Sequence, residues 1–160
     1  MSMGKTVIFM RHGKATYAED AFNDFERPLV ARGRQEAKQT AVLLKENNLI
    51  PEMILSSPAT RTAGTAQIAA HIFDYLAEQI VYHAPLYMGR THEYIDAINN
   101  LKANCILIVG HNPEMQALAF HFGKVGQAGF PTSSAVALQF EDGIISVQSK
   151  AVVLGEWLRE

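Results

Sequence analysis

Three short polar clusters contain residues suited to chemistry, and each one follows an apolar run typical of a buried strand. The clusters are Arg11-His12-Gly13, the segment from Ser56 to Arg61, and Gly110-His111-Asn112. In open α/β sheets, ligands bind beyond the carboxyl ends of parallel strands. We therefore expect the three clusters to meet in one crevice.

The cationic and imidazole groups of these clusters are Arg11, His12, Arg61 and His111. A guanidinium can bind two phosphate oxygens at once, and a neutral imidazole held in one tautomer is a nucleophile. One histidine could attack phosphorus and form a phosphohistidine, while the other histidine and the arginines stabilise the charge on the equatorial oxygens. The sequence thus predicts a phosphoryl site. Arg61 could instead be a surface helix residue and His111 a turn residue, but neither alternative explains why all three clusters follow strands.

Other motifs do not support a different chemistry. Gly4-Lys5-Thr6 lacks the earlier glycine of a nucleotide P-loop, and the glycines within 123–129 do not fit a dinucleotide-binding pattern. His92-Glu93 lacks the second histidine of a zinc-protease helix, and Ser56-Ser57 lacks the G-x-S-x-G elbow of serine hydrolases. We assign no metal and no cofactor.

The elements that must position these clusters alternate between strand and helix along the chain. Short apolar runs predict strands at residues 7–10, 53–55, 79–83 and 105–109. Helical spacing predicts a helix over 32–48, which Asn47-Asn48 can end with a left-handed stop, and a short helix over 91–98. Ser57-Pro58 and Asn112-Pro113 each place an N-cap residue before a proline and predict two further helix starts. We expect βαβ units in a three-layer α/β/α sandwich with a mostly parallel central sheet and an antiparallel edge.

Two connecting regions complete the predicted fold. The polar stretch from Thr16 to Leu29 is expected to be an irregular loop, and long loops near strand ends are often functional. At the other end of the chain, residues 135–140 and 144–149 are expected to form a hairpin around Glu141-Asp142-Gly143.

Length and composition limit the class of protein. A chain of 160 residues is the usual size of one domain, which we expect to span residues 1–160. A net charge of −2 gives no general attraction for nucleic acid or anionic lipid. The apolar run Val7-Ile8-Phe9-Met10 is too short for a membrane span or signal peptide, and the lone Cys105 opens an apolar strand. We expect a cytoplasmic protein and leave its oligomeric state open.

Taken in order, the motifs resemble the histidine phosphatase (phosphoglycerate mutase-like) superfamily, and in particular its small SixA-type phosphohistidine phosphatase branch. The residues that carry the resemblance are Phe9-Met10-Arg11-His12-Gly13, Arg27-Pro28-Leu29 with Gly33, Ser56-Ser57-Pro58 with Arg61 and Thr65-Ala66, Val109-Gly110-His111-Asn112-Pro113, and Thr132-Ser133. The resemblance implies that His12 is the phosphorylated nucleophile and that Arg11, Arg61 and His111 form the phosphate pocket around it. It implies neither a metal nor an organic cofactor.

The sequence also departs from the larger members of that superfamily. Lys14-Ala15 stands where those members usually have Glu-Thr after Arg-His-Gly, and the acid that protonates the leaving oxygen cannot be placed. Glu93, Asp20 and Asp24 are the candidates for this acid. As substrate-binding residues around the pocket we expect Gly13, Lys14, Arg27 and Asn112.

A site without a strong acid suits cleavage of a P–N bond better than cleavage of an alkyl ester, because imidazole leaves with less help than an alkoxide. We therefore expect a phosphorylated protein as the substrate, with its phosphoryl group on histidine. The alternatives are a small-molecule phosphomonoesterase that uses the same site and a non-catalytic module that recognises phosphate. A mutase is less consistent with the short chain, which leaves little material for a lid.

Overall fold

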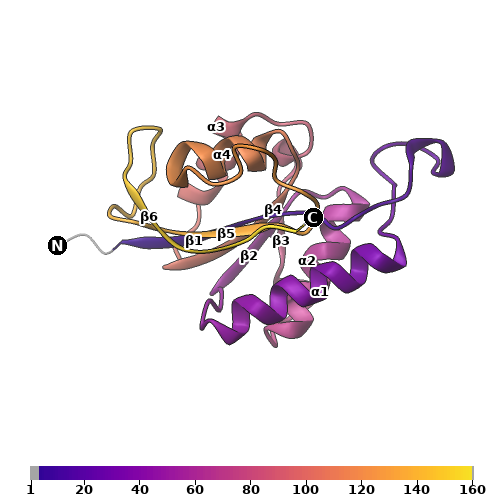
Figure 1. Cartoon of the computed structure of the whole chain (residues 1–160), viewed down its shortest axis with the longest axis horizontal. Helices are drawn as coiled ribbons and strands as arrows, with labels where there is room; N and C mark the ends of the chain where they lie inside the picture. Colours follow the sequence, from indigo (N-terminus) through magenta and orange to yellow (C-terminus); the bar gives the residue numbers. More distant parts are fainter. Residues whose placement is uncertain (1–3, 160) are drawn as a thin grey trace.

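A single six-stranded sheet organises the computed structural model, which describes residues 4–159 (Figure 1). The strands are β1 (Lys5–Arg11), β2 (Met53–Ser56), β3 (Val81–Tyr82), β4 (Cys105–Gly110), β5 (Ala135–Phe140) and β6 (Ala151–Trp157). They lie in the order β3-β2-β4-β1-β5-β6. The pairs among β1 to β4 are parallel, whereas β5 is antiparallel to both β1 and β6. The predicted mostly parallel sheet with antiparallel pairing at one side is confirmed.

Four α-helices cover the two faces of this sheet. They are α1 (Ala31–Glu46), α2 (Thr60–Ile72), α3 (Thr91–Asn99) and α4 (Glu114–Gly123). Figure 1 shows α1 and α2 on one face and α3 and α4 on the other, so the predicted α/β/α sandwich is confirmed. None of the helices formed by residues 4–159 has the length and apolar character that a bilayer crossing requires.

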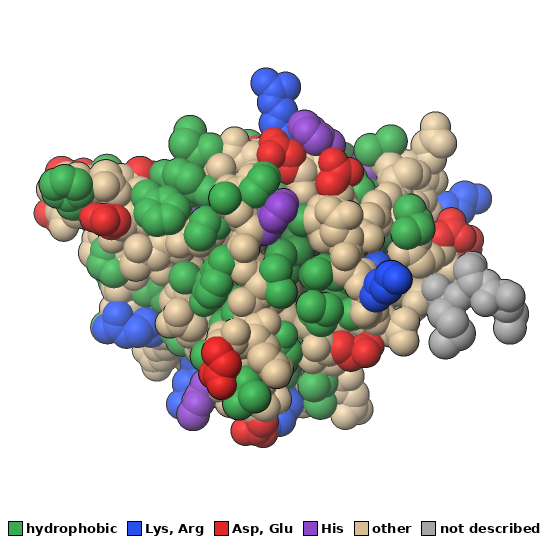
Figure 2. Space-filling model, turned by 180° about the vertical axis from the view of Figure 1, so that it is seen from behind, with side chains coloured by type: hydrophobic (Ala, Val, Ile, Leu, Met, Phe, Trp, Pro, Cys, Tyr) green, Lys and Arg blue, Asp and Glu red, His purple; other side chains and the backbone are tan. Residues whose placement is uncertain are grey.

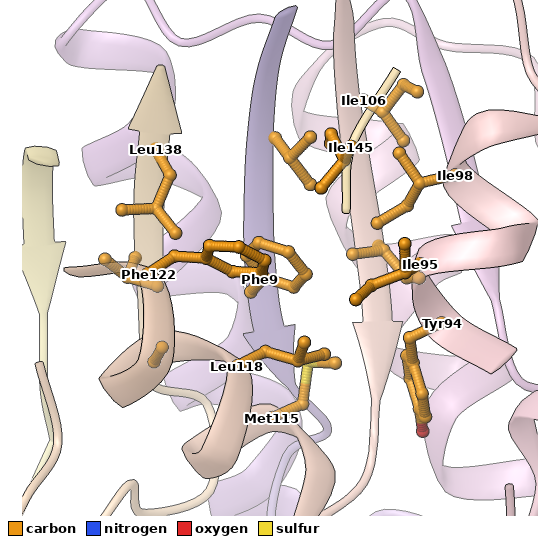
Figure 3. Packing of buried hydrophobic residues seen from close by; sticks show 14 of the residues in the cluster. Phe9, Tyr94, Ile95, Ile98, Ile106, Met115, Leu118, Phe122, Leu138 and Ile145 are labelled. Atoms are coloured by element: carbon orange, nitrogen blue, oxygen red, sulfur yellow. The ribbon is translucent and has the colours of Figure 1, made fainter. Parts of the chain in front are cut away.

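Two hydrophobic cores result because neighbouring residues of a strand point to opposite faces. On β1, Val7 and Phe9 pack with α3 and α4, whereas Ile8 and Met10 pack with α1 and α2. Figure 3 shows Phe9 between side chains from β5, α3 and α4. All four of these β1 side chains are fully buried. The strand that ends in Arg11 is therefore fixed in the middle of the molecule.

The loop between β1 and α1 projects from the carboxyl edge of the sheet (Figure 1). The prediction of an irregular segment at Thr16–Leu29 is largely right, since it contains only a 3₁₀ turn at Ala18–Asp20 and an antiparallel bridge between Ala15 and Leu29. Within this loop the carbonyl of Phe25 accepts from the amide of Thr60 and the carbonyl of Asp24 accepts from Arg61, so the loop is bound to the start of α2.

The predicted hairpin is wrong in its second half. Residues 144–149 form no strand, and β5 pairs instead with β6 at Ala151–Trp157. The side chain of Asn99 on α3 accounts for the difference: it donates to the carbonyl of Ile145 at 2.8 Å and accepts from the amide of Ile145 at 2.9 Å. These two hydrogen bonds use the backbone groups that strand pairing would need.

Several element boundaries also differ from the predictions. Ser57 is not an N-cap, because α2 begins at Thr60 and the Ser57 hydroxyl accepts from the amide of Ala59 at 3.3 Å. The predicted strand 79–83 shrinks to Val81–Tyr82, since Ala77–Gln79 form a 3₁₀ turn. The left-handed stop after α1 is confirmed, with Asn48 at a φ of 60°.

Candidate active site

The structure brings the three polar clusters together because β1, β4 and β2 are neighbours in the sheet and end at the same edge. A cavity of about 360 Å³ lies there. Its lining comprises Arg11, His12, Lys14, Ala15, Tyr17, Arg27, Arg61, His111, Asn112 and Thr132. All four predicted catalytic residues share this cavity, together with three of the four predicted substrate-binding residues.

His12 is held in one orientation from both sides. Its amide donates to the carbonyl of Gly110 at 3.1 Å, and its own carbonyl accepts from the amide of Ser133 at 3.0 Å. The ring Nδ1 lies 2.7 Å from the carbonyl oxygen of Gly13. A carbonyl oxygen only accepts, so Nδ1 carries the proton and Nε2 keeps its lone pair. Burial lowers the pKa of His12 to about 3, which keeps the ring neutral and nucleophilic at ordinary pH.

His111 faces His12, with 5.4 Å between the ring centroids. Its Nε2 lies 2.8 Å from the hydroxyl of Ser57, and its backbone amide donates to the phenol oxygen of Tyr94 at 3.2 Å. The Tyr94 hydroxyl in turn donates to the carbonyl of Leu86 at 3.0 Å. Burial and the charge of Arg61 lower the pKa of His111 to about 4. Both histidines are therefore neutral in a cavity whose positive charge comes from its arginines and Lys14.

Arg11 and Arg61 have donors that the described residues do not satisfy. Arg11 donates from Nη1 to the carbonyl of Phe130 at 3.2 Å, and Arg61 donates to the carbonyl and the carboxylate of Asp24 at 2.8 and 3.2 Å. The Nε atom of each guanidinium is buried and has no acceptor among residues 4–159. Burial and the Arg61 charge also lower the pKa of Arg11. Two buried, unpaired donors in a cationic cavity are suited to the oxygens of a phosphoryl group.

Gly13 supports the site through its backbone. Its amide donates to the Thr65 hydroxyl at 2.9 Å, and that hydroxyl donates to the carbonyl of Arg61 at 2.8 Å. A Cβ at Gly13 would lie 2.7 Å from the carbonyl oxygen of Gly33, so a side chain cannot fit there. Gly13 was predicted to bind substrate, but its amide is already used, and the structure gives it a positioning role between β1 and α2.

The other predicted binding residues border the cavity to different extents. Lys14 is exposed at its edge. Arg27 donates from Nε to the carbonyl of Thr16 at 2.6 Å and from Nη1 to Asp24 at 3.0 Å. Asn112 donates to the carbonyl of Phe130 at 3.0 Å and accepts from the amide of Gln116 at 3.2 Å. Arg27 and Asn112 thus hold the walls of the cavity, whereas Lys14 is available to approach a phosphate.

Of the three candidate acids, only Asp24 lies beside the site. Glu93 accepts from the backbone amide of Arg90 at 3.1 Å in a capping box, and Asp20 is exposed in the 3₁₀ turn. The Asp24 carboxylate accepts from the Tyr87 hydroxyl at 2.7 Å, and also from Arg27 and Arg61. The Tyr87 hydrogen bond and these arginines lower the pKa of Asp24 to about 2. Asp24 is therefore a carboxylate at neutral pH and has no proton to give.

A second cavity, of about 510 Å³, adjoins the first and shares Arg61, His111 and Asn112 with it. Asp24, Tyr87 and Glu114 also line this cavity. Burial raises the pKa of Glu114. Sequence reasoning missed Glu114 because a glutamate after Pro113 looks like an ordinary residue of a first helical turn.

Ser133 is a further residue whose importance the sequence did not reveal. It is fully buried with a left-handed φ of 65°, and its carbonyl accepts from the Thr40 hydroxyl at 2.8 Å. A serine in this backbone conformation is uncommon and is a mark of structural constraint. Its amide fixes the carbonyl of His12, so Ser133 and Thr40 connect α1 to the orientation of His12.

The neutral state of His12 predicts a loss of stability in acid. The unfolded histidine binds a proton near pH 6.5, whereas the native one does so only near pH 3. The unfolded chain therefore binds more protons between these values, and the free energy of unfolding should fall by about 1.4 kcal/mol per pH unit from His12 as pH drops from 6.5 toward 4. Urea unfolding of wild type and His12→Gln at pH 6.5 and 5 tests this. The variant should lose less stability; equal losses would contradict the assigned state of His12.

Comparison with known proteins identifies the family. The sequence pattern of the histidine phosphatase superfamily (branch 1) matches residues 7–84, which include the first two polar clusters. An uncharacterized protein of Mycobacterium tuberculosis is 31% identical over 151 residues, with 92% of this chain and 89% of the relative covered. This chain belongs to the histidine phosphatase superfamily. The resemblance seen in the sequence motifs is thereby confirmed.

Similarity to a solved structure extends over the rest of this histidine phosphatase chain. The crystal structure of the proposed phosphohistidine phosphatase SixA from Agrobacterium tumefaciens has 28% sequence identity and a TM-score of 0.82, and covers 99% of this chain and 100% of that chain. The fold is thus phosphoglycerate mutase-like throughout, including β4 and His111. An uncharacterized chloroplast protein of Arabidopsis thaliana is 28% identical over 121 residues, and the match covers 56% of its length.

Proposed function

We propose that this histidine phosphatase hydrolyses phosphohistidine on a protein substrate through a phosphoryl group carried on His12. The observation that carries the proposal is the hydrogen bond from His12 Nδ1 to the Gly13 carbonyl at 2.7 Å. It leaves Nε2 unprotonated in a cavity that also holds Arg11, Arg61 and His111. A neutral, oriented imidazole beside unpaired guanidinium donors has the parts that nucleophilic attack on phosphorus needs.

The reaction proceeds in two displacements. In the first, the His12 Nε2 lone pair forms a bond to phosphorus, the P–N bond of the substrate breaks, and the electron pair goes to the departing imidazole, which takes a proton from water. In the second, water attacks phosphorus, loses a proton, and the bond to His12 breaks to release inorganic phosphate. Arg11 and Arg61 stabilise the equatorial oxygens in both steps, and His111 lines the same cavity.

The state of Asp24 favours a P–N bond over an ester. An alkoxide needs a proton as it leaves, but Asp24 is ionised, with a pKa of about 2. An imidazole leaves with much less assistance. Similarity to the Agrobacterium SixA structure supports the same choice. A small-molecule phosphomonoesterase is the second candidate, because Glu114 lines the adjoining cavity and burial raises its pKa, as a proton donor requires.

Initial hydrolysis rates on a phosphohistidine peptide and on a panel of alkyl phosphates, measured with EDTA and an enzyme-free blank, test the proposal. We expect kcat/KM for the peptide to exceed that for the alkyl phosphates by about 10²-fold or more, since only the esters need an acid. A preference for an alkyl phosphate that Glu114→Gln abolishes would establish the phosphomonoesterase instead. Binding of the peptide without hydrolysis of any substrate would point to a phosphate-recognising module.

A further inference from the structure

The two most exposed large hydrophobic side chains among residues 4–159 lie on two segments that each contribute lining residues to the active-site cavities. Phe22 is 90% exposed in the loop between β1 and α1, and Met88 is 84% exposed just before α3. Met88 lines the second cavity, and Tyr17, itself 65% exposed, lines the first. Single exposed hydrophobic residues are normal on a protein surface, but a group of them near two adjoining cavities marks a binding surface.

These side chains belong to one surface although they are far apart in the sequence. The Tyr87 hydroxyl donates to Asp24 at 2.7 Å, and the Tyr87 ring meets the ring of Phe25 edge-on, with 5.0 Å between centroids. The loop containing Phe22 is thus joined to the segment containing Met88. We call this surface the docking rim, and define it as Tyr17, Phe22, Phe25, Tyr87 and Met88.

The backbone of Met88 supports a role outside folding. Its φ of 60° lies in the left-handed region, which costs a residue with a Cβ about 1 kcal/mol. Because the Met88 side chain is exposed in the isolated chain, its burial offsets little of this backbone cost. A glycine would satisfy the backbone better. A contact made by the methionine side chain with a binding partner would explain its presence at this position.

The charge of the projecting loop indicates the chemistry of that partner. Glu19, Asp20 and Glu26 are exposed there alongside Phe22. The projection at the left of Figure 2 carries acidic and hydrophobic side chains side by side. Negative potential around apolar contacts attracts a partner that has basic residues next to apolar ones. The arginines inside the cavity still select the phosphoryl group itself.

We propose that the docking rim binds the substrate protein through a segment that carries basic and apolar side chains next to its phosphohistidine. This inference rests on the function proposed above and names the surface that recognises the substrate. A small phosphate ester fills the cavity beside His12 without reaching Phe22 on the projecting loop. Phe22, which lines neither cavity, should therefore affect the KM for phosphorylated peptides and leave the hydrolysis of small esters unchanged.

The test uses the full chain and its variants Phe22→Ala and Met88→Gly, with Ile144→Ala as a matched control. Ile144 is 68% exposed and follows β5 near the end of the sheet opposite the site. The probes are a dodecameric phosphohistidine peptide with flanking lysine and leucine residues, its glutamate-flanked counterpart, and p-nitrophenyl phosphate. We expect each rim variant to raise KM for the lysine peptide about 10-fold, because one apolar contact contributes about 1.4 kcal/mol. Phe22→Ala changes a residue outside both cavities and should leave kcat and p-nitrophenyl phosphate hydrolysis unchanged.

A charge-reversal variant, Glu19→Lys with Asp20→Lys, tests the electrostatic part. Wild type should prefer the lysine peptide over the glutamate peptide, and this variant should reduce or reverse the preference at low salt. Unchanged KM values in the rim variants, or equal losses on p-nitrophenyl phosphate, would overturn the docking rim. If wild type prefers phosphoserine to phosphohistidine within the same peptides, the proposed function fails. The rim variants measured on the phosphoserine peptide would then still decide whether the surface docks protein.

Discussion

Replacing His12 with alanine is expected to lower kcat/KM for every phosphorylated substrate by about 10⁴-fold or more, because the variant has no atom that can form the bond to phosphorus. The thermal midpoint should change little at pH 7.5. The wild-type ring is neutral there, and its Nδ1 hydrogen bond to Gly13 is replaced by water at the edge of the cavity. Steady-state kinetics and circular dichroism melting of both proteins measure the two effects.

A covalent intermediate provides an independent check on this role. Rapid acid-free quenching of wild type with a ³²P-labelled substrate should show a phosphoryl group that is stable in alkali and labile in acid, and His12→Ala should show none. His71→Ala is the matched control, because His71 is exposed on α2. If His12→Ala is unfolded at pH 7.5, or if it retains wild-type turnover, the assignment of His12 as the nucleophile is wrong.

Arg61→Lys is expected to reduce kcat/KM by about 10²- to 10³-fold, although the charge is conserved. The Arg61 guanidinium donates to the carbonyl and carboxylate of Asp24 with its two Nη atoms and has a buried Nε available for a phosphate oxygen. A lysine has one nitrogen and cannot meet these separate acceptors in the same geometry. Inhibition by inorganic phosphate or tungstate should weaken in parallel.

The control for this variant is Arg32→Lys. Arg32 is exposed on α1 and, among residues 4–159, pairs only with Glu36 at 3.3 Å, so its replacement should leave turnover unchanged. Activity of Arg61→Lys within about twofold of wild type would show that the site needs only a positive charge at that position, contrary to the geometry described above.

The sequence was sufficient to predict that the three polar clusters meet, because their meeting depends only on the topology of the sheet. Arg11, Ser56 and Gly110 each end a strand, and parallel strands place their carboxyl ends at one edge whatever their exact order. The same reasoning predicted the three layers from the alternation of strands and helices. Local patterns were sufficient wherever the physical cause was local, as in the left-handed stop at Asn48.

The parts that sequence reasoning missed depend on contacts between distant residues. Asn99 replaces strand pairing at Ile145, Tyr94 supports the backbone of His111, and Ser57 bonds to the ring of His111 instead of capping α2. No local pattern connects these positions. The state of Asp24 was also hidden, since its low pKa results first from Tyr87, 63 residues further along the chain. Placing the three candidate carboxylates relative to the site required the folded structure.

The bond between Arg61 and Asp24 has a consequence for the energetics of the whole site. Arg61 binds the loop, through the carbonyl and carboxylate of Asp24, and also lines the cavity proposed to receive the phosphoryl group. Two events that use one guanidinium are thermodynamically linked, and such coupling is reciprocal. If a partner binds at Asp24 and changes the affinity of the cavity for phosphate by some factor, phosphate changes the affinity for that partner by the same factor. In the proposed reaction, release of phosphate and release of the dephosphorylated protein would therefore be coupled equilibria.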